Sequence, residues 1–237
     1  MGKMVLRLLF AVLLLAMVAG CAAKKVAYMP GDVASSVKAE NLVPKVDNMA
    51  LLFDKSDSMN TQYKLDSRLA LAKATSSQMV QTIPADLKLN SELRMFGIEK
   101  LFGDEGTWLE LGWSPVRSEL QRAVDNIGTR GLGMTPMART LAATGEDLKS
   151  QSGNTAVILV SDFEDMEGVV DMNTKAVLEN VAKLKAEYGD RVCIYPILVG
   201  DAAGGKKLAE QIAAAGQCGF AENADNLTTP AAMVVPM

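Results

Sequence analysis

The sequence predicts an α/β fold with a doubly wound, mostly parallel central sheet and helices on both faces. Short apolar runs of strand length alternate with longer segments whose apolar residues recur at helical spacing. Two of the runs, "TAVILVSD" (155–162) and "RVCIYPILVG" (191–200), are almost continuously apolar. Such runs are typical of strands that are buried on both faces of a parallel sheet.

The remaining elements follow from the same patterns. The segment 89–98 is expected to be a strand and to pair with 106–115 as an antiparallel hairpin, because apolar residues partly alternate along the second segment. Ser114 with Pro115, and Thr135 with Pro136, are expected to begin two helices as N-cap and first helical residue. The other expected strands are 49–53 and 219–224, and the other expected helices are 64–83, 172–190 and 205–216.

The N-terminus has the pattern of an export signal. Residues 1–20 contain a basic start, an apolar run from Leu8 and small residues before Cys21, and the run is too short to span a bilayer. The tetrapeptide "VAGC" resembles the lipobox of bacterial lipoproteins, which implies that Cys21 is the lipid anchor. The alternative is a secretory peptide followed by an incidental cysteine.

This gives a domain organisation of four parts: a signal peptide (1–20), a lipid anchor and tether (21–47), one folded domain (48–227) and a short tail (228–237). We expect the cell envelope as the location. The outer membrane is preferred, because Ala22 replaces the aspartate that retains some lipoproteins in the inner membrane.

Charge and composition exclude several classes of function. Without residues 1–20 the chain has 22 basic and 28 acidic residues, a net charge of −6, so nucleic acid is not an expected partner. The chain has no histidine, which excludes Ser-His-Asp and Cys-His catalysis and histidine-zinc sites. Once Cys21 is lipidated, Cys193 and Cys218 remain as a candidate disulfide in an exported protein, with two buried free thiols as the alternative.

The segment "FDKSDSMN" (53–60) places several oxygen-bearing side chains directly after an apolar strand. A phosphoenzyme would need a second acid two residues after Asp54, where the chain has Ser56. A dinucleotide-binding glycine motif does not follow this strand, and no Walker phosphate loop is present.

A metal site fits the segment better. Asp54, Ser56 and Ser58 converge on one point, and two further oxygen groups, Thr135 and Asp162, stand in a loop and at a strand end. Hard cations such as Mg²⁺ bind oxygen ligands in near-octahedral geometry. Three neutral hydroxyls and two carboxylates leave the cation able to bind a carboxylate from outside.

At these residues the chain resembles the von Willebrand factor type A (VWA) domain with its metal-ion-dependent adhesion site. The resemblance covers about residues 46–227 and rests on the pieces 54–58, 133–136 and 161–162. It implies that Ser56, Ser58 and Thr135 coordinate Mg²⁺, with Mn²⁺ or Ca²⁺ as alternatives, and that Asp54 and Asp162 hold its waters. It also implies a protein partner that presents a carboxylate, and no enzyme activity.

Alternatives remain at this stage. The chain could be a structural scaffold with a stabilising metal, or a hydrolase that uses Asp54 or Asp162 as a base. Phe163 stands where the family often has glycine, and it could crowd the site or wall one side of it. Glu164 and Asp165 could add negative charge at the rim, which would repel an acidic ligand.

Overall fold

The computed structural model describes residues 28, 31, 33–41, 43–97, 106–164 and 173–234 of the chain. The predicted signal peptide, the predicted lipid-anchor residue Cys21, Asp165 and the last three residues of the predicted tail lie outside these ranges. No helix in the described ranges is long and apolar enough to cross a bilayer.

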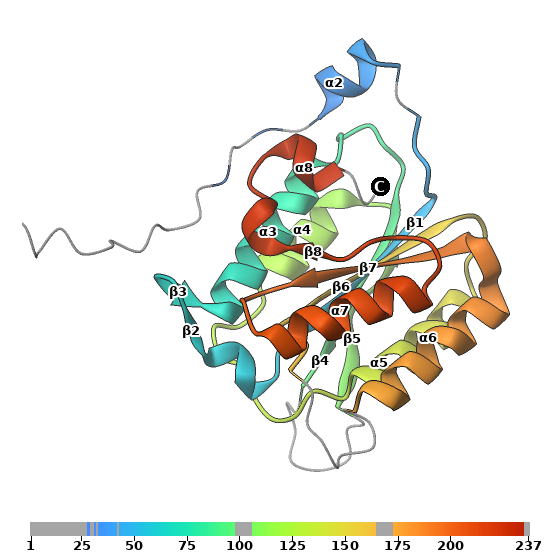
Figure 1. Cartoon of the computed structure of the whole chain (residues 1–237). Coiled ribbons are helices and arrows are strands. Elements are labelled where there is room, and N and C mark those ends of the chain that lie inside the picture. Colours follow the sequence, from blue (N-terminus) through green and yellow to red (C-terminus); the bar gives the residue numbers. More distant parts are fainter. Residues whose placement is uncertain are drawn as a thin grey trace, which may run out of the picture.

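A six-stranded sheet with the order β5-β4-β1-β6-β7-β8 forms the centre of the molecule (Figure 1). Its strands are β1 Asn48–Asp54, β4 Asn90–Phe96, β5 Thr107–Ser114, β6 Thr155–Ser161, β7 Val192–Leu198 and β8 Glu222–Asn223. β5 pairs antiparallel with β4, and every other neighbouring pair is parallel. The predicted fold class and the predicted antiparallel pairing are therefore confirmed.

Helices cover both faces of the sheet, because side chains along each central strand alternate between two apolar clusters. Leu51 packs in one cluster and Leu52 in the other. The first cluster includes residues of α3 (Arg68–Thr82), α4 (Arg117–Asp125) and α8 (Pro230–Val234). The second includes residues of α5 (Met137–Leu148), α6 (Thr174–Tyr188) and α7 (Ala203–Ala215).

Both helix starts predicted from Ser/Thr-Pro pairs are wrong. Ser114 pairs with β4 as the last residue of β5, and α4 begins at Arg117. Thr135 is not a cap either: the N-cap of α5 is Pro136, whose ψ of 55° is not helical. The sequence pattern also gave no sign of a small hairpin, β2 (Gln62–Tyr63) with β3 (Asp66–Ser67), which leads directly into α3.

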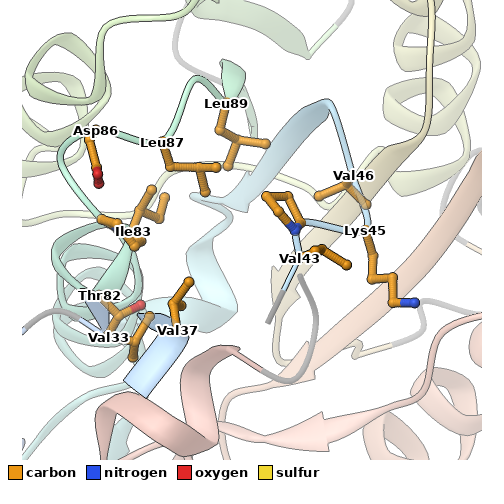
Figure 2. Close-up of a pocket in the computed structure, with 12 residues that line it drawn as sticks. Val33, Val37, Val43, Lys45, Val46, Thr82, Ile83, Asp86, Leu87 and Leu89 are labelled. Atoms are coloured by element: carbon orange, nitrogen blue, oxygen red, sulfur yellow. The ribbon is translucent and has the colours of Figure 1, made fainter. Parts of the chain in front are cut away.

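The predicted tether is partly structured. Within it, α2 (Ala34–Ala39) packs beside the end of α3, and the Val33 N–H donates to the Thr82 carbonyl oxygen over 3.1 Å. Figure 2 shows apolar side chains of α2, of the segment before β1 and of the loop after α3 around one groove of about 430 Å³. Because this loop and segment precede β4 and β1, the groove lies at the amino ends of these strands.

Cys193 in β7 and Cys218 before β8 form a disulfide, with their Cα atoms 4.9 Å apart. The predicted pairing is therefore present in the structure. It closes a segment of 25 residues that contains α7.

A Cys193→Ser/Cys218→Ser variant is expected to lose about 3 kcal/mol of stability, because its unfolded chain is less restricted. Urea unfolding of both proteins measures the loss, and equal midpoints would contradict the prediction.

Glu92 in β4 is fully buried, and neither of its carboxylate oxygens has a hydrogen-bond partner. Burial, followed by the negative charge of Asp147, raises the pKa of Glu92 from 4.5 to about 8. The folded protein therefore keeps a proton that the unfolded chain releases near pH 4.5, and stability falls as pH rises between these two values.

The isosteric variant Glu92→Gln is expected to weaken this pH dependence by about 1.4 kcal/mol for each pKa unit of the shift. Chemical unfolding at pH 5 and at pH 8 measures the slope for both proteins. The shift of Asp54 described below has the same sign and is present in both proteins, so the difference between the slopes reports Glu92 alone. Equal slopes would show that Glu92 is ionised in the folded protein.

Candidate metal centre

The carboxyl ends of β1 and β6 bring the two predicted acidic residues to one edge of the sheet. Asp54 is the last residue of β1, and Asp162 follows directly after β6. The two strands are parallel neighbours, with Phe53 opposite Val160, so they end side by side. Asp54 is 0% and Asp162 is 1% exposed. This edge is where open α/β sheets bind their ligands.

The carboxylate of Asp54 is held at both oxygens. The Ser56 backbone N–H donates to Oδ1 over 2.8 Å, and the Ser161 hydroxyl donates to Oδ2 over 2.5 Å. Ser161 also accepts a hydrogen bond from the Phe163 N–H at 2.9 Å. Ser161 had no separate role among the predicted ligands, although it lies in the motif beside Asp162.

Two serine hydroxyls connect the edge of β1 to that of β6. The oxygens of Ser56 and Ser58 are 3.1 Å apart, and the Ser58 side chain forms a hydrogen bond with Asp162. The structure thus brings Asp54, Ser56, Ser58 and Asp162 into one connected group of oxygen atoms.

The loop that carries Thr135 is fastened to the same turn. The Leu132 N–H donates to the Lys55 carbonyl over 2.8 Å, and the Asp57 N–H donates to the Gly133 carbonyl over 2.9 Å. Thr135 itself is 5% exposed.

Asn60 and Gly131 lock this loop in place. The Asn60 amide both donates to and accepts from the Gly131 backbone, at 2.9 and 2.8 Å. A Cβ atom at Gly131 would lie 2.1 Å from the Ser56 carbonyl oxygen, so only glycine permits this approach. Sequence reasoning missed Asn60, which lies two residues after the D-x-S-x-S motif and resembles an ordinary turn residue.

Burial makes the two acids costly in their charged form. Burial, followed by the negative charge of Asp162, raises the pKa of Asp54 from 3.8 to about 7. Burial also raises the pKa of Asp162, against the hydrogen bond from the Glu164 N–H and the one with Ser58. Two neighbouring buried carboxylates therefore favour a positive partner.

The donor set fits a hard divalent cation. In the described residues no cluster of three or more His, Cys, Asp or Glu side chains could hold a metal, so a cation here would depend on hydroxyl oxygens. Ser56, Ser58, Thr135, Asp54 and Asp162 offer only oxygen, which suits Mg²⁺, Mn²⁺ or Ca²⁺ rather than a soft metal.

The sequence suggested that Phe163 could crowd the site or wall one side of it, but the side chain points into the core instead. Its side chain is fully buried in the apolar cluster beneath α5, α6 and α7. Its φ of +54° is in the left-handed region, which explains why glycine suits this position.

Arg68 is a residue of the site that sequence reasoning missed. It is the first residue of α3, and its Nη1 donates to Asp162 Oδ2 over 2.8 Å and to Glu164 Oε1 over 2.5 Å. An arginine at the start of an amphipathic helix carries no local signal for this contact. The pairing partly offsets the rim charge expected from Glu164.

Comparisons with known proteins give the fold. No family model matches the chain, and no curated protein matches it in sequence. Solved structures do match, at identities that show the fold alone, and they identify it as the VWA fold.

The VWA domain of SpRpn10 aligns with a TM-score of 0.53 and 13% identity over 75% of this chain and 87% of that chain. The vWF domain of the type V pili tip protein Mfa5 from Porphyromonas gingivalis gives 0.57 and 11%, over 81% of this chain and 94% of that one. The PilB minor pilin from Streptococcus sanguinis gives 0.57 and 12%, over 81% and 60%. This chain therefore spans well under two thirds of PilB.

Phe163 allows packing and backbone strain to be separated. Phe163→Ala and Phe163→Gly are both expected to destabilise the protein by about 3 kcal/mol through loss of the buried ring. The glycine variant should be the more stable of the two by about 1 kcal/mol, because glycine adopts a positive φ without strain. Thermal and urea unfolding compare the three proteins, and an alanine variant more stable than the glycine variant would show that the backbone is unstrained.

Proposed function

We propose that this chain is a membrane-anchored lipoprotein of the bacterial cell envelope whose VWA-type domain binds a divalent cation and, through it, an acidic group on a protein partner. Asp54, Ser56, Ser58, Thr135 and Asp162 hold the cation, with Mg²⁺ as the first candidate. When bound, the cation supplies a positive centre for a carboxylate of the partner. The biological role is adhesion or the assembly of an envelope complex.

The observation that carries the proposal is the burial of two adjacent carboxylates next to two linked hydroxyls. Two buried carboxylates this close repel each other when both are ionised, and the raised pKa of Asp54 expresses this; a cation beside them would relieve the repulsion. The structural neighbours add support, since one is titled a manganese-loaded Plasmodium vivax TRAP protein and another a mussel byssus matrix protein with a zinc-occupied MIDAS motif.

The localisation rests on the sequence. The lipobox-like "VAGC" and the export signal support a lipid anchor at Cys21, with the outer membrane preferred. A metabolic label with a palmitate analogue that is lost in Cys21→Ser tests the anchor independently of the metal.

A second candidate is a scaffold in which the cation only stabilises the fold. Burial of Asp54 and Asp162 favours it, because a cation between them relieves their repulsion whether or not a partner binds. In the adhesion role the partner binds only through the cation, whereas in the scaffold role partner binding does not depend on it. The less favoured hydrolase requires turnover, and the structural neighbours from a pilus tip and from the byssus thread matrix give it no support.

Asp54→Ala and the control Asp57→Ala test the proposal. Asp57 is an exposed acid of the same turn, where it accepts a hydrogen bond from Asn60 at 3.0 Å. We expect calorimetry to show Mg²⁺ binding by the wild type and the control and a loss of at least about tenfold in affinity for Asp54→Ala. The wild type and Asp57→Ala should also capture envelope proteins in the presence of Mg²⁺, and Asp54→Ala should not.

The outcomes separate the candidates. Metal-independent capture by all three proteins would contradict the adhesion role. Stabilisation by Mg²⁺ together with unchanged capture by Asp54→Ala would establish the scaffold instead. If the wild type binds none of Mg²⁺, Mn²⁺ and Ca²⁺, the metal centre itself is excluded.

A further inference from the structure

We propose that Arg68 is a built-in counter-cation of the metal centre, which stabilises the site without metal and weakens its affinity for the divalent cation. The inference rests on the proposed function and adds a form of regulation to it: metal binds in competition with a positive charge that the fold itself supplies. The centre would therefore respond to the cation concentration rather than hold its cation permanently.

The contacts place this charge on one of the proposed ligands. The Nη1 atom of Arg68 lies 2.8 Å from Asp162 and 2.5 Å from Glu164, and the arginine side chain is only 9% exposed. The Nε atom is buried without a hydrogen-bond partner, so the guanidinium loses one of its hydrogen bonds to water in this position and gains none in exchange at Nε. A Cβ atom at Gly200 would lie 3.2 Å from this Nε, which indicates how closely the fold encloses the group.

Charge balance gives the direction of the effect without metal. Asp54, Asp162 and Glu164 can together place three negative charges at this edge of the sheet, and Arg68 is the cation that bridges two of them. Removal of Arg68 leaves Asp162 buried beside Asp54 and without an ion-pair partner among the residues that the structure describes. Loss of one partner of a buried ion pair is strongly destabilising, so the metal-free protein should suffer most.

The effect on metal affinity has the opposite sign. An arginine that merely oriented Asp162 would support metal binding, and its loss would weaken the affinity. Asp162, however, has other supports: the Glu164 N–H at 3.2 Å and the Ser58 hydroxyl. Its backbone is also fixed, because a Cβ atom at Gly205 would lie 2.1 Å from its carbonyl oxygen. Removal of a positive charge near the cation therefore outweighs the loss of orientation.

The experiment uses Arg68→Met, which keeps the apolar stem, and Arg68→Lys, which keeps the charge. In chelator, Arg68→Met is expected to melt below the wild type, while its Mg²⁺ dissociation constant falls about tenfold. Arg68→Lys should remain near the wild type in both measurements. Differential scanning calorimetry and titration calorimetry provide the two readouts.

Arg94→Met is the matched control. Arg94 forms another largely buried ion pair, with 2.6 Å between Nη2 and Asp147 Oδ2, and the pair is built from β4 and α5. Its loss should lower the melting temperature equally with and without Mg²⁺ and leave the dissociation constant unchanged. A purely structural Arg68 would behave in the same way.

Glu164→Gln is expected to change Mg²⁺ affinity in the opposite direction to Arg68→Met. The Glu164 side chain is 43% exposed, so the fold should tolerate the substitution. It removes a negative charge that engages Arg68, and Mg²⁺ binding should weaken.

The inference is overturned, and the proposed function left intact, if Arg68→Met binds Mg²⁺ no more tightly than the wild type does. If Arg68→Met does not fold, strengthened Mg²⁺ binding by Glu164→Gln overturns it. A wild type that binds none of Mg²⁺, Mn²⁺ and Ca²⁺ overturns both proposals.

Discussion

The burial of two like charges, Asp54 and Asp162, is the constraint on which the rest of the site depends. The parallel pairing of β1 with β6 sets their separation, because both strands end at the same edge of the sheet. The surrounding hydrogen bonds then keep the carboxylates available: Ser56 and Ser161 hold one, and Ser58 and Glu164 hold the other. Both carboxylates can stay ionised at this buried edge of the sheet only if a positive charge lies beside them.

Two positive charges of different kinds can meet that need. Arg68 is supplied by the fold and is always present, whereas a divalent cation is supplied by the solution. In the proposed competition, Arg68 balances the carboxylates of the metal-free site and the divalent cation balances those of the metal-bound site. The populations of the two states would then depend on the metal concentration. Two glycines permit the close backbone approaches around the site, since a Cβ atom at Gly131 or Gly205 would lie 2.1 Å from the carbonyl oxygen of Ser56 or Asp162.

The sequence predicted those features of the site that depend on residues close together in the chain. The D-x-S-x-S turn and Asp162 could be read from the sequence because each directly follows an apolar strand, and parallel strands place such residues together. Arg68 and Asn60 could not, since their contacts join segments 94 and 71 residues apart. The N-cap prediction at Ser114 failed for a related reason: pairing with β4 takes Ser114 into β5, and this tertiary contact overrides a local helix signal.

The ends of α3 relate the site to the proposed membrane anchor. Arg68 begins the helix at the metal centre, and Thr82 ends it at the apolar groove, about 22 Å away at 1.5 Å per residue. Tyr28 is already bound to this helix, since its hydroxyl lies 2.7 Å from that of Thr75. A lipid on Cys21 would therefore be separated from the domain by only seven residues, at most about 25 Å of chain, rather than by the long tether that the sequence suggested. With so short a connection, the direction in which the domain faces would govern which partners reach Asp54, because Tyr28 lies in one pocket with Tyr63 and Asp66 of the hairpin that leads into α3, toward the end of the helix that carries Arg68.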